Sequence, residues 1–400
     1  MSDIWGAPRE NEFFFLPRAP QLESATAVAL PAEEPETQTE RAADAALWAV
    51  VLAGGIGSRF WPLSTPERPK QLLSLVCERP LIAETVSRLA PLIPPERVLV
   101  LTSRDIAPAL HAAIPEVPEA NMLVEPGPLG TAAALAWGAQ EVARRAGPET
   151  ILCSIHADLA VAFPDLFRDV LKRAARLAAT GPHLCAVAVR PTRPETGFGY
   201  MRPGPPLDRA VPVDDGGACR VRDFIEKPGP ILAEALIAEG ALWNAGIFVW
   251  RASVVLDALA EHATELTPGL AALKRRDYES FAASIQSVSI ERGLLERSRQ
   301  VVAIPADFGW DDVGTWASLR RARDLDDSGN GAIGSVYFAE STGNVVHSES
   351  GPVVLYGVSG LLVVSLPGVT FVTPLERATD LRPLLEALPN EMRTRAARSE

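Results

Sequence analysis

Short apolar runs alternate with longer amphipathic stretches along most of the chain. The run at residues 47–53 ends in glycines and has the character of a strand buried on both faces of a sheet. Similar runs follow at residues 98–101, 122–124, 151–155 and 184–189, and helix-like stretches separate them at residues 80–89, 131–146 and 165–179. This alternation predicts βαβ units and an α/β domain with a doubly wound mixed sheet.

The pattern changes at both ends of this region. Shorter strand-like pieces at residues 199–202, 221–226 and 246–250 predict an extension of the same domain that covers a pocket. Residues 331–373 alternate apolar pairs with Gly, Ser and Asn, which predicts a small all-β region, and a helix is expected near residues 380–388. Residues 1–45 are rich in Pro, Ala, Glu and Thr, which is typical of disorder. We therefore expect a disordered acidic tail (1–45), a catalytic domain (46–328) and a β region with a final helix (329–390).

Composition narrows the class of protein. The formal net charge of -12 disfavours a nucleic-acid partner, so an anionic substrate needs a locally basic pocket. The four cysteines show neither zinc-ligand nor redox spacing, which fits a reducing compartment. No apolar run approaches the roughly 20 residues of a membrane helix, and no secretory signal pattern is evident. We expect a cytoplasmic protein without a membrane or nucleic-acid partner.

A glycine-rich segment directly after the first predicted strand is the strongest chemical signal. It runs Leu52-Ala53-Gly54-Gly55-Ile56-Gly57-Ser58-Arg59, and Pro69-Lys70-Gln71 follows. Glycines let backbone N–H groups approach an anion closely, and a guanidinium and an ammonium beside them suit a triphosphate. The segment matches neither the P-loop nor the dinucleotide fingerprint, and a generic glycine turn is the alternative.

Two separate acids form the second signal. Asp158 follows the predicted strand at 151–155, at the sheet edge where open α/β folds bind ligands, and Asp312 lies in the run Gly309-Trp310-Asp311-Asp312-Val313-Gly314. Two such carboxylates can hold one hard cation against phosphate oxygens. The alternative is that each residue simply caps the helix that follows it.

A third group has the chemistry of a sugar phosphate pocket. Glu226 and Asn244 can bond sugar hydroxyls, Lys227 can pair with a phosphate, and Gly199 and Gly246 let a ring approach the backbone. Each of these residues, taken singly, can also be explained by a purely structural role without any part in binding. The five histidines lack metal-ligand spacing, and no Gly-x-Ser-x-Gly elbow is present, which disfavours a hydrolase.

The order of these motifs resembles that of mannose-1-phosphate guanylyltransferases across about residues 47–388. The resemblance covers the glycine segment with Pro69-Lys70-Gln71, the segment from Glu125-Pro126 to Thr131-Ala132, and Asp158. It continues through residues 197–200, 224–228, 243–248, 289–297 and 308–316. It implies a Rossmann-like nucleotidyltransferase domain, followed by a short left-handed β-helix, that joins GTP and mannose 1-phosphate with Mg²⁺.

The same resemblance implies a role for each site residue. Arg59 would hold the β- and γ-phosphates, Lys70 would hold the reacting phosphates, Lys227 would hold the sugar phosphate, and Asp158 with Asp312 would bind Mg²⁺. The remaining substrate-binding residues would be Leu52, Gly54, Gly55, Gly57, Ser58, Thr131, Gly199, Glu226, Asn244 and Gly246. A homodimer through the β region is the expected assembly.

Three other functions remain as alternatives. The first is the same chemistry on another sugar or base, such as a heptose or glucose 1-phosphate. The second is a regulatory homologue that binds a sugar nucleotide without catalysis. A glycosyltransferase fits less well, because such enzymes usually hold their metal with a close Asp-x-Asp pair, which is not evident near Asp158.

Overall fold

The computed structural model describes residues 47–54, 58–207 and 217–395, and all of these belong to one compact unit of the chain. The predicted acidic tail therefore lies outside the described residues, as do Gly55 and Gly57 of the glycine segment. Across the described ranges, none of the helices combines the length and the apolar character needed to cross a bilayer.

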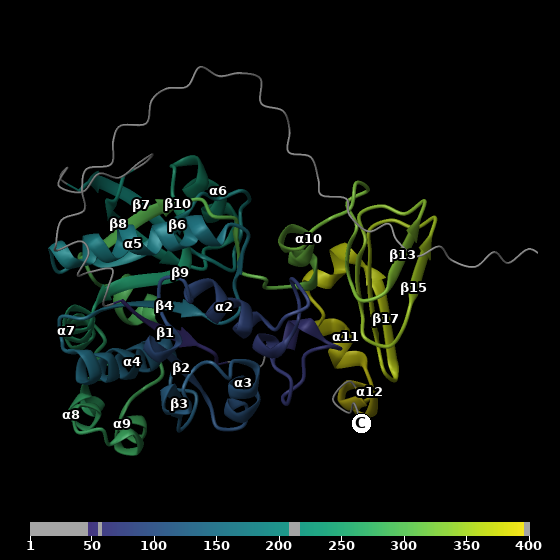
Figure 1. Ribbon diagram of the computed structural model, residues 1–400. Helices are drawn as coiled ribbons and strands as arrows, with labels where there is room; N and C mark the ends of the chain where they lie inside the picture. The colour runs from purple at the N-terminus through teal and green to yellow at the C-terminus, as the bar shows by residue number, and fades with distance from the viewer. Residues whose placement is uncertain (1–46, 55–57, 208–216, 396–400) are drawn as a thin grey trace, which may run out of the picture. The chain divides into compact units, whose positions relative to one another are not determined.

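A mixed sheet of nine strands forms the centre of the fold, in the order β3-β2-β1-β4-β9-β6-β10-β8-β7 (Figure 1). Strands β1 to β4 are parallel, whereas β9 is antiparallel to both of its main neighbours, β4 and β6. The predicted alternation of strands and helices is confirmed. The strands are β1 (Trp48–Leu52), β2 (Val98–Ser103), β3 (Met122–Glu125), β4 (Ile151–His156), β6 (Leu184–Val189), β7 (Gly199–Pro206), β8 (Cys219–Glu226), β9 (Leu242–Arg251) and β10 (Val301–Ala306).

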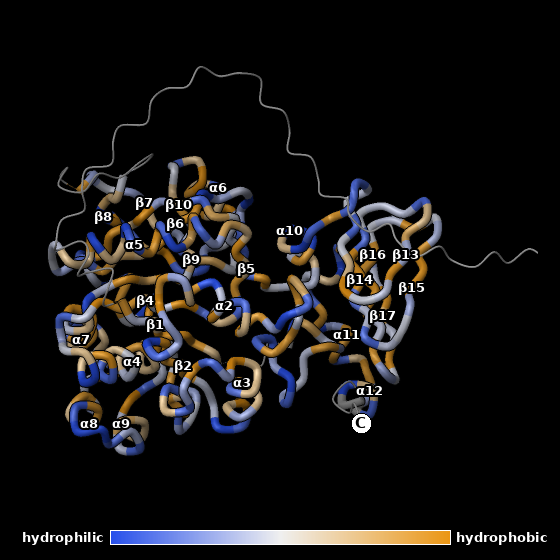
Figure 2. Tube along the Cα trace, viewed as in Figure 1, coloured by the Kyte–Doolittle hydropathy of each residue, from blue (hydrophilic) through white to orange (hydrophobic). Residues whose placement is uncertain are grey.

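Helices cover both faces of this sheet. Alternate residues of β1 point to opposite faces, so Ala49 and Val51 join one hydrophobic cluster and Val50 and Leu52 join the other. One face packs against α2 (Leu81–Leu89), α3 (Ala107–Ala113) and α5 (Pro164–Thr180). The other packs against α4 (Thr131–Ala146), α7 (Ala252–His262), α8 (Leu270–Lys274) and α9 (Tyr278–Ser284). The central strands β1, β4 and β9 carry long hydrophobic stretches, as double-sided burial requires (Figure 2).

The strand-like pieces after residue 196 belong to the same sheet. Strands β7, β8 and β10 extend it beyond β6, and the piece at residues 246–250 lies in β9, between β4 and β6. A separate two-stranded sheet joins β5 (Ala160–Val161) to β11 (Trp310–Asp311) in antiparallel register. Shorter elements are η1 (Ser58–Phe60), η2 (Lys70–Leu72), η3 (Pro95–Arg97), η4 (Glu119–Asn121), α6 (Pro230–Ala238), η5 (Thr267–Gly269), η6 (Glu291–Leu295), η7 (Trp316–Ser318) and α10 (Leu319–Ala322).

The C-terminal region is rich in strands, as predicted. Its strands are β12 (Gly331–Ile333), β13 (Val336–Ala339), β14 (Val345–Ser348), β15 (Val353–Tyr356), β16 (Leu361–Leu366) and β17 (Val369–Pro374). Strands β12, β14 and β16 pair in parallel, β13 pairs in parallel with β15, and β17 returns antiparallel to β16. After η8 (Leu375–Thr379), the expected final helix is present as α11 (Arg382–Ala387), and α12 (Asn390–Arg395) follows.

Candidate active site

A cleft of about 530 Å³ opens at the carboxyl ends of the central strands. It brings together residues that are separated by up to 255 positions, from Arg59 to Gly314. Open α/β sheets bind their ligands at this edge, so the location fits a substrate site. The lining residues are Arg59, Phe60, Lys70, His156, Asp158, Leu159, Gly197, Phe198, Gly199, Glu226, Lys227, Asn244, Ala245, Gly246, Glu291, Trp310, Asp312 and Gly314.

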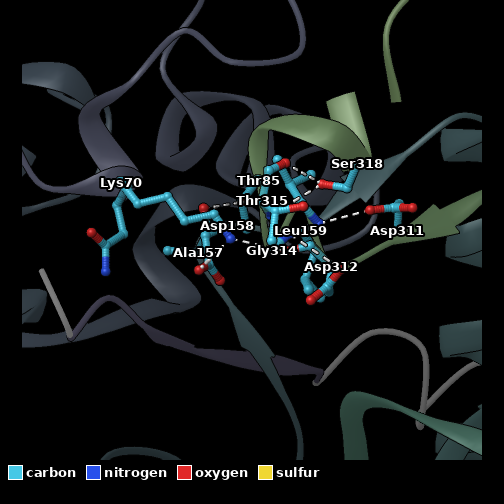
Figure 3. A network of polar contacts seen from close by, with 12 residues as sticks. Lys70, Thr85, Ala157, Asp158, Leu159, Asp311, Asp312, Gly314, Thr315 and Ser318 are labelled. Carbon is cyan, nitrogen blue, oxygen red and sulfur yellow. Dashed lines mark hydrogen bonds and ion pairs between the residues drawn. The ribbon is translucent and has the colours of Figure 1, made fainter. Parts of the chain in front are cut away.

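The two predicted metal acids lie close together because two short strands pair beside the cleft. Asp158 stands two residues after β4 and just before β5, and Asp312 directly follows β11. The antiparallel register pairs Asp311 with Ala160, which places the two acids on neighbouring segments (Figure 3). Neither caps a helix, because Phe163 precedes α5 and Thr315 precedes η7. The capping alternative is therefore wrong for both residues.

Lys70 joins the two acids. Its ammonium donates to Oδ2 of Asp158 at 2.9 Å and to the backbone carbonyl of Asp312, also at 2.9 Å (Figure 3). Burial is the largest single influence and would raise the pKa of the Asp158 carboxyl, but the charges of Lys70 and His156 together with the hydrogen bonds to the carboxylate hold that pKa below its usual value. Asp158 is consequently ionised at neutral pH.

The Asp312 carboxyl has the opposite electrostatic balance. Burial, followed by the charge of Asp311, raises its pKa to about 6. Among the described residues its oxygens accept one hydrogen bond, from the backbone N–H of Gly314 at 3.2 Å. Such a carboxylate gains from a nearby cation, and Mg²⁺ is usually held by one or two carboxylates together with substrate phosphates. The described residues include no cluster of three or more metal-ligating side chains, so the pair fits Mg²⁺ bound jointly with substrate.

Helix α2 holds the backbone around Asp158. Thr85 donates its hydroxyl to the carbonyl of Ala157 at 3.3 Å (Figure 3). Arg88 donates to the carbonyl of Leu159 at 2.9 Å. Burial lowers the pKa of Arg88 to about 10, which still leaves it charged at neutral pH. The Ala157 N–H also donates to the carbonyl of Leu52 at the end of β1. Asp158 therefore lies on a turn in which the backbone carbonyls of both neighbouring residues accept a hydrogen bond from a side chain of α2.

A second lysine–carboxylate pair lies in the same cleft. Lys227 donates its ammonium to Oε1 of Glu226 at 2.7 Å. Burial raises the pKa of Glu226, and the charge of Glu291 adds to this effect although Lys227 opposes it. Gly199 allows this arrangement, because a Cβ there would lie 2.8 Å from Oε2 of Glu226 and 2.7 Å from the Phe224 ring. The predicted sugar-phosphate residues therefore do meet.

Asn244 and Gly246 complete the cleft along β9. Asn244 is buried, and its side-chain oxygen accepts the backbone N–H of Gly246 at 3.1 Å. Gly246 has φ +68°, and a Cβ there would approach the ring of His156 to 3.2 Å. Only glycine suits this conformation and this close approach. His156 lines the cleft, although the sequence offered no reason to assign it a role.

The glycine segment contributes through the residues that flank it. Arg59 is exposed and lines the cleft, and Gln71 donates its amide to the carbonyl of Gly54 at 2.9 Å. Leu52 is the last residue of β1 and is buried. Gly55, Gly57 and the Ser58 side chain are outside what the structure describes. Thr131 begins α4, where its hydroxyl accepts the N–H of Ile290 at 2.8 Å, so its observed contact serves the fold.

Two features beside the cleft received no role from the sequence, although their residues lie in segments that carry the family resemblance. Glu125 ends β3 at the same sheet edge, and a Cβ on Gly54 would lie 3.9 Å from its Oε2. Burial raises the pKa of the Glu125 carboxyl to about 7, and no described residue pairs with that carboxyl. The second feature is an aromatic cluster of Phe198, Trp243 and Trp310, whose ring centroids lie 5.1 to 6.4 Å apart. Residue spacing alone does not predict either the buried carboxyl of Glu125 or the aromatic cluster.

Comparisons with known proteins indicate the class of enzyme. Residues 48–328 match the family model described as nucleotidyl transferase. The chain is 30% identical over 357 residues to mannose-1-phosphate guanylyltransferase of Sinorhizobium fredii, which covers 86% of this chain and 68% of that protein. It is 32% identical over 362 residues to mannose-1-phosphate guanylyltransferase of Escherichia coli K12, which covers 86% and 74%.

A solved structure shows the same fold at higher identity. The crystal structure of mannose-1-phosphate geranyltransferase from Thermus thermophilus superposes with a TM-score of 0.75 at 33% identity, and covers 85% of this chain and 98% of that one. The fold and the cleft thus define a nucleotidyltransferase, and the chain belongs to the nucleotidyl transferase family. The relatives named above are similar to it over most of its length, and they carry the name that the order of motifs suggested.

Proposed function

We propose that this enzyme is a mannose-1-phosphate guanylyltransferase, which converts GTP and α-D-mannose 1-phosphate to GDP-mannose and pyrophosphate. The observation that carries the proposal is the single cleft in which Arg59, Lys70, Lys227, Asp158 and Asp312 meet. Two anions must be held together for this reaction, and within a chain of net charge -12 the cleft brings Arg59, Lys70 and Lys227 to one place, beside carboxylates that can hold a cation. The named relatives supply the choice of guanine and mannose.

The reaction is a direct displacement at phosphorus. A phosphate oxygen of mannose 1-phosphate bonds to the α-phosphorus of GTP, while the bond from that phosphorus to the β-bridging oxygen breaks and pyrophosphate leaves with the electron pair. The sugar phosphate is already mostly dianionic at neutral pH, because the second pKa of a phosphate monoester is about 6, so no general base is needed. The protein's task is alignment and charge neutralisation.

Each charged residue has a part in that alignment. Arg59 and Lys70 hold the phosphates of GTP, and Lys227 holds the phosphate of mannose 1-phosphate. Glu226, Asn244, Gly199 and Gly246 hold the sugar. Asp158 and Asp312 would hold Mg²⁺, which would neutralise phosphate charge during transfer. The Lys70–Asp158 contact holds the ammonium in the cleft beside one of these carboxylates.

Glu125 suits the base of the nucleotide. Guanine presents two adjacent donors, N1–H and the 2-amino group, and a carboxylate presents two adjacent acceptors. We therefore expect Glu125→Gln to lower kcat/KM for GTP by about tenfold to hundredfold, the usual worth of a bidentate base contact. Steady-state kinetics with GTP, ITP and ATP check this, with Glu119→Gln before the opposite end of β3 as control. Equal losses for all three nucleotides would contradict it.

The remaining parts of the proposal concern organisation. We place the domain boundaries at 1–45, 46–328 and 329–390, and assign the strands from residue 331 onward to a short left-handed β-helix. Two parallel strand stacks support the β-helix, together with a ladder in which Asn344 donates its amide to the side chain of Asn330 at 2.9 Å. We further propose a cytoplasmic homodimer, which light scattering on the purified full chain would test.

Pyrophosphate release tests the function itself. The purified chain is incubated with Mg²⁺ and each of GTP, ATP, UTP and dTTP, against mannose, glucose and heptose 1-phosphates, with Asp312→Ala as control. We expect release with GTP and mannose 1-phosphate that is lost in the variant. Release with another pair would keep the chemistry and change the substrates. Tight binding of GDP-mannose without any release would favour the regulatory homologue.

A further inference from the structure

Segment 68–75, which carries Lys70, is connected to the C-terminal strands at both of its ends, directly at the first and through Arg323 at the second. At the first end, Arg68 donates through both terminal nitrogens to the two oxygens of Glu349, each at 2.8 Å. At the second end, the buried Arg323 donates to the carbonyl of Leu75 at 2.6 Å. Lys70 lies between these two attachments, within the turn η2.

The two attachments are the ends of one continuous chain of polar contacts. Arg323 also donates to the carbonyl of Val346 at 2.9 Å and contacts Nδ1 of His347 at 3.4 Å. Because arginine can only donate, Nδ1 must accept, and the ring proton of His347 is on Nε2. That nitrogen lies 3.1 Å from Oε1 of Glu349 and donates to it. The chain from Arg323 through His347 and Glu349 to Arg68 therefore begins and ends on the segment around Lys70.

Burial makes the Arg323–His347 part of this chain costly to disrupt, whereas the side chains of Arg68 and Glu349 are 41% and 31% exposed. His347 is fully buried and Arg323 is 6% exposed, so neither can exchange its partner for bulk water. Burial lowers the pKa of Arg323 to about 9, and the contact with His347 is the largest cause that brings the pKa of Glu349 to about 2. The arginine and the glutamate are therefore both charged at neutral pH.

Apolar contacts reinforce the same attachment. Phe60 packs edge-on against Trp316 with ring centroids 5.3 Å apart, and Trp61 packs likewise against Phe371 at 5.3 Å. Trp316 also donates its indole N–H to the carbonyl of Trp61 at 2.9 Å. The segment between Arg59 and Lys70 thus shares a hydrophobic cluster with residues of β14 and β16.

We propose that Arg68, Glu349, His347 and Arg323 are positioning residues through which the C-terminal strands hold the Lys70 ammonium in the cleft. They act without touching substrate, so their effect on the reaction passes through Lys70. The inference rests on the proposed function for its assay, and it adds a catalytic purpose for the C-terminal region.

The test combines Glu349→Gln with Lys70→Met in the full-length protein. We expect Glu349→Gln to lower kcat about tenfold, less than the hundredfold that a 1 Å misplacement can cost, with KM for mannose 1-phosphate within about twofold of the wild type. In the Lys70→Met background, Glu349→Gln should cause no further loss of kcat, because the group that it positions is gone. Arg68→Met should behave in the same way, and Glu349→Asp should recover part of the activity.

Glu149→Gln is the matched control, since Glu149 pairs with Arg251 at 2.7 Å in an exposed contact away from the cleft. Melting temperatures measured alongside separate folding from positioning. Equal kcat losses from Glu349→Gln in the wild-type and Lys70→Met backgrounds would overturn the inference, as would unchanged kcat in folded Glu349→Gln and Arg68→Met. The wild-type arm reports separately on the proposed function, because absence of pyrophosphate release from the wild type would reject that function.

Discussion

The cleft contains two lysine–carboxylate pairs whose burial is reversed. In the first pair, the Lys70 side chain is 9% exposed and the Asp158 side chain is 27% exposed. In the second pair, the Lys227 side chain is 59% exposed and the Glu226 side chain is 9% exposed. The pKa values of the two carboxyls also shift in opposite directions. Burial raises both, but for Asp158 the charges of Lys70 and His156 and its hydrogen bonds together outweigh it, whereas for Glu226 burial and the charges of Glu291 and Glu296 outweigh Lys227.

The difference in exposure and contacts between Lys70 and Lys227 suggests a different role for each pair. Lys70 is held by two contacts on a segment attached at both ends, so its ammonium keeps one position while charge develops at phosphorus. Lys227 is held by a single contact to its neighbour in sequence, and its side chain can move to follow a bound phosphate. We infer that the first pair serves the reaction step and the second serves capture of the sugar phosphate.

Loss of Lys70 should have the largest effect. Lys70→Met is expected to lower kcat by about a hundredfold to a thousandfold, the range for removal of a preorganised charge that stabilises a transition state. KM for mannose 1-phosphate should change little. Pyrophosphate release in the steady state measures both quantities, with the exposed Lys274→Met as control. A raised KM with normal kcat would reverse the assigned roles.

Loss of Lys227 should have a smaller effect of another kind. Lys227→Met is expected to raise KM for mannose 1-phosphate about tenfold with a lesser fall in kcat, because an exposed charge contributes mainly to ground-state binding. The same assay with varied sugar phosphate checks it. If kcat fell as far as in Lys70→Met, the division between the two pairs would be wrong.

The smallest expected effects concern stability and its pH dependence. Asp158 has a depressed pKa, so it stabilises the fold above about pH 3.8, its unfolded value, and this contribution is lost as the pH falls through its folded pKa. Glu226 has a raised pKa, so its charged form destabilises the fold at neutral pH, and that cost disappears below its unfolded value of 4.5.

Two neutral variants separate these contributions. At pH 7 we expect Asp158→Asn to lower the free energy of unfolding by about 2 kcal/mol, because it leaves the buried Lys70 ammonium without its partner. Glu226→Gln should raise it by about 1 kcal/mol. Urea unfolding at pH 7 and pH 4 measures both, and the gain from Glu226→Gln should shrink at pH 4. A loss of stability from Glu226→Gln at pH 7 would contradict the assigned balance.

Much of the fold could be predicted from local patterns. Strands such as β1 and β4 are buried on both faces, so they are continuous apolar runs whatever their neighbours are. The antiparallel insertion of β9 between β4 and β6 could not be predicted, because strand order depends on contacts that a single periodicity does not encode. The helices α4 and α5 were predicted within one residue of their observed bounds.

The candidate site likewise has residues that could be predicted from the sequence and contacts that could not. Asp158 and Gly199 could be selected because they stand at strand ends or turns with recognisable chemistry. The contact between Lys70 and the Asp312 carbonyl spans 242 positions and depends on the β5–β11 pairing, which involves only two residues on each strand. Glu125 lies in a segment that carries the family resemblance but received no role from it, and His347 belongs to no motif. Their significance comes from burial and partners, which exist only in the folded chain.

The central claim is that the cleft aligns two substrates for direct transfer, without an intermediate covalently bound to the enzyme. Its described lining contains no Ser, Thr or Cys, although His156 and several carboxylates are present. The most direct test uses GTP with a single-configuration sulfur substitution at the α-phosphorus, and determines the configuration of the thio-GDP-mannose formed with mannose 1-phosphate. One in-line displacement predicts inversion at phosphorus. Retention would require two displacements through a nucleotidyl-enzyme, and would contradict the account.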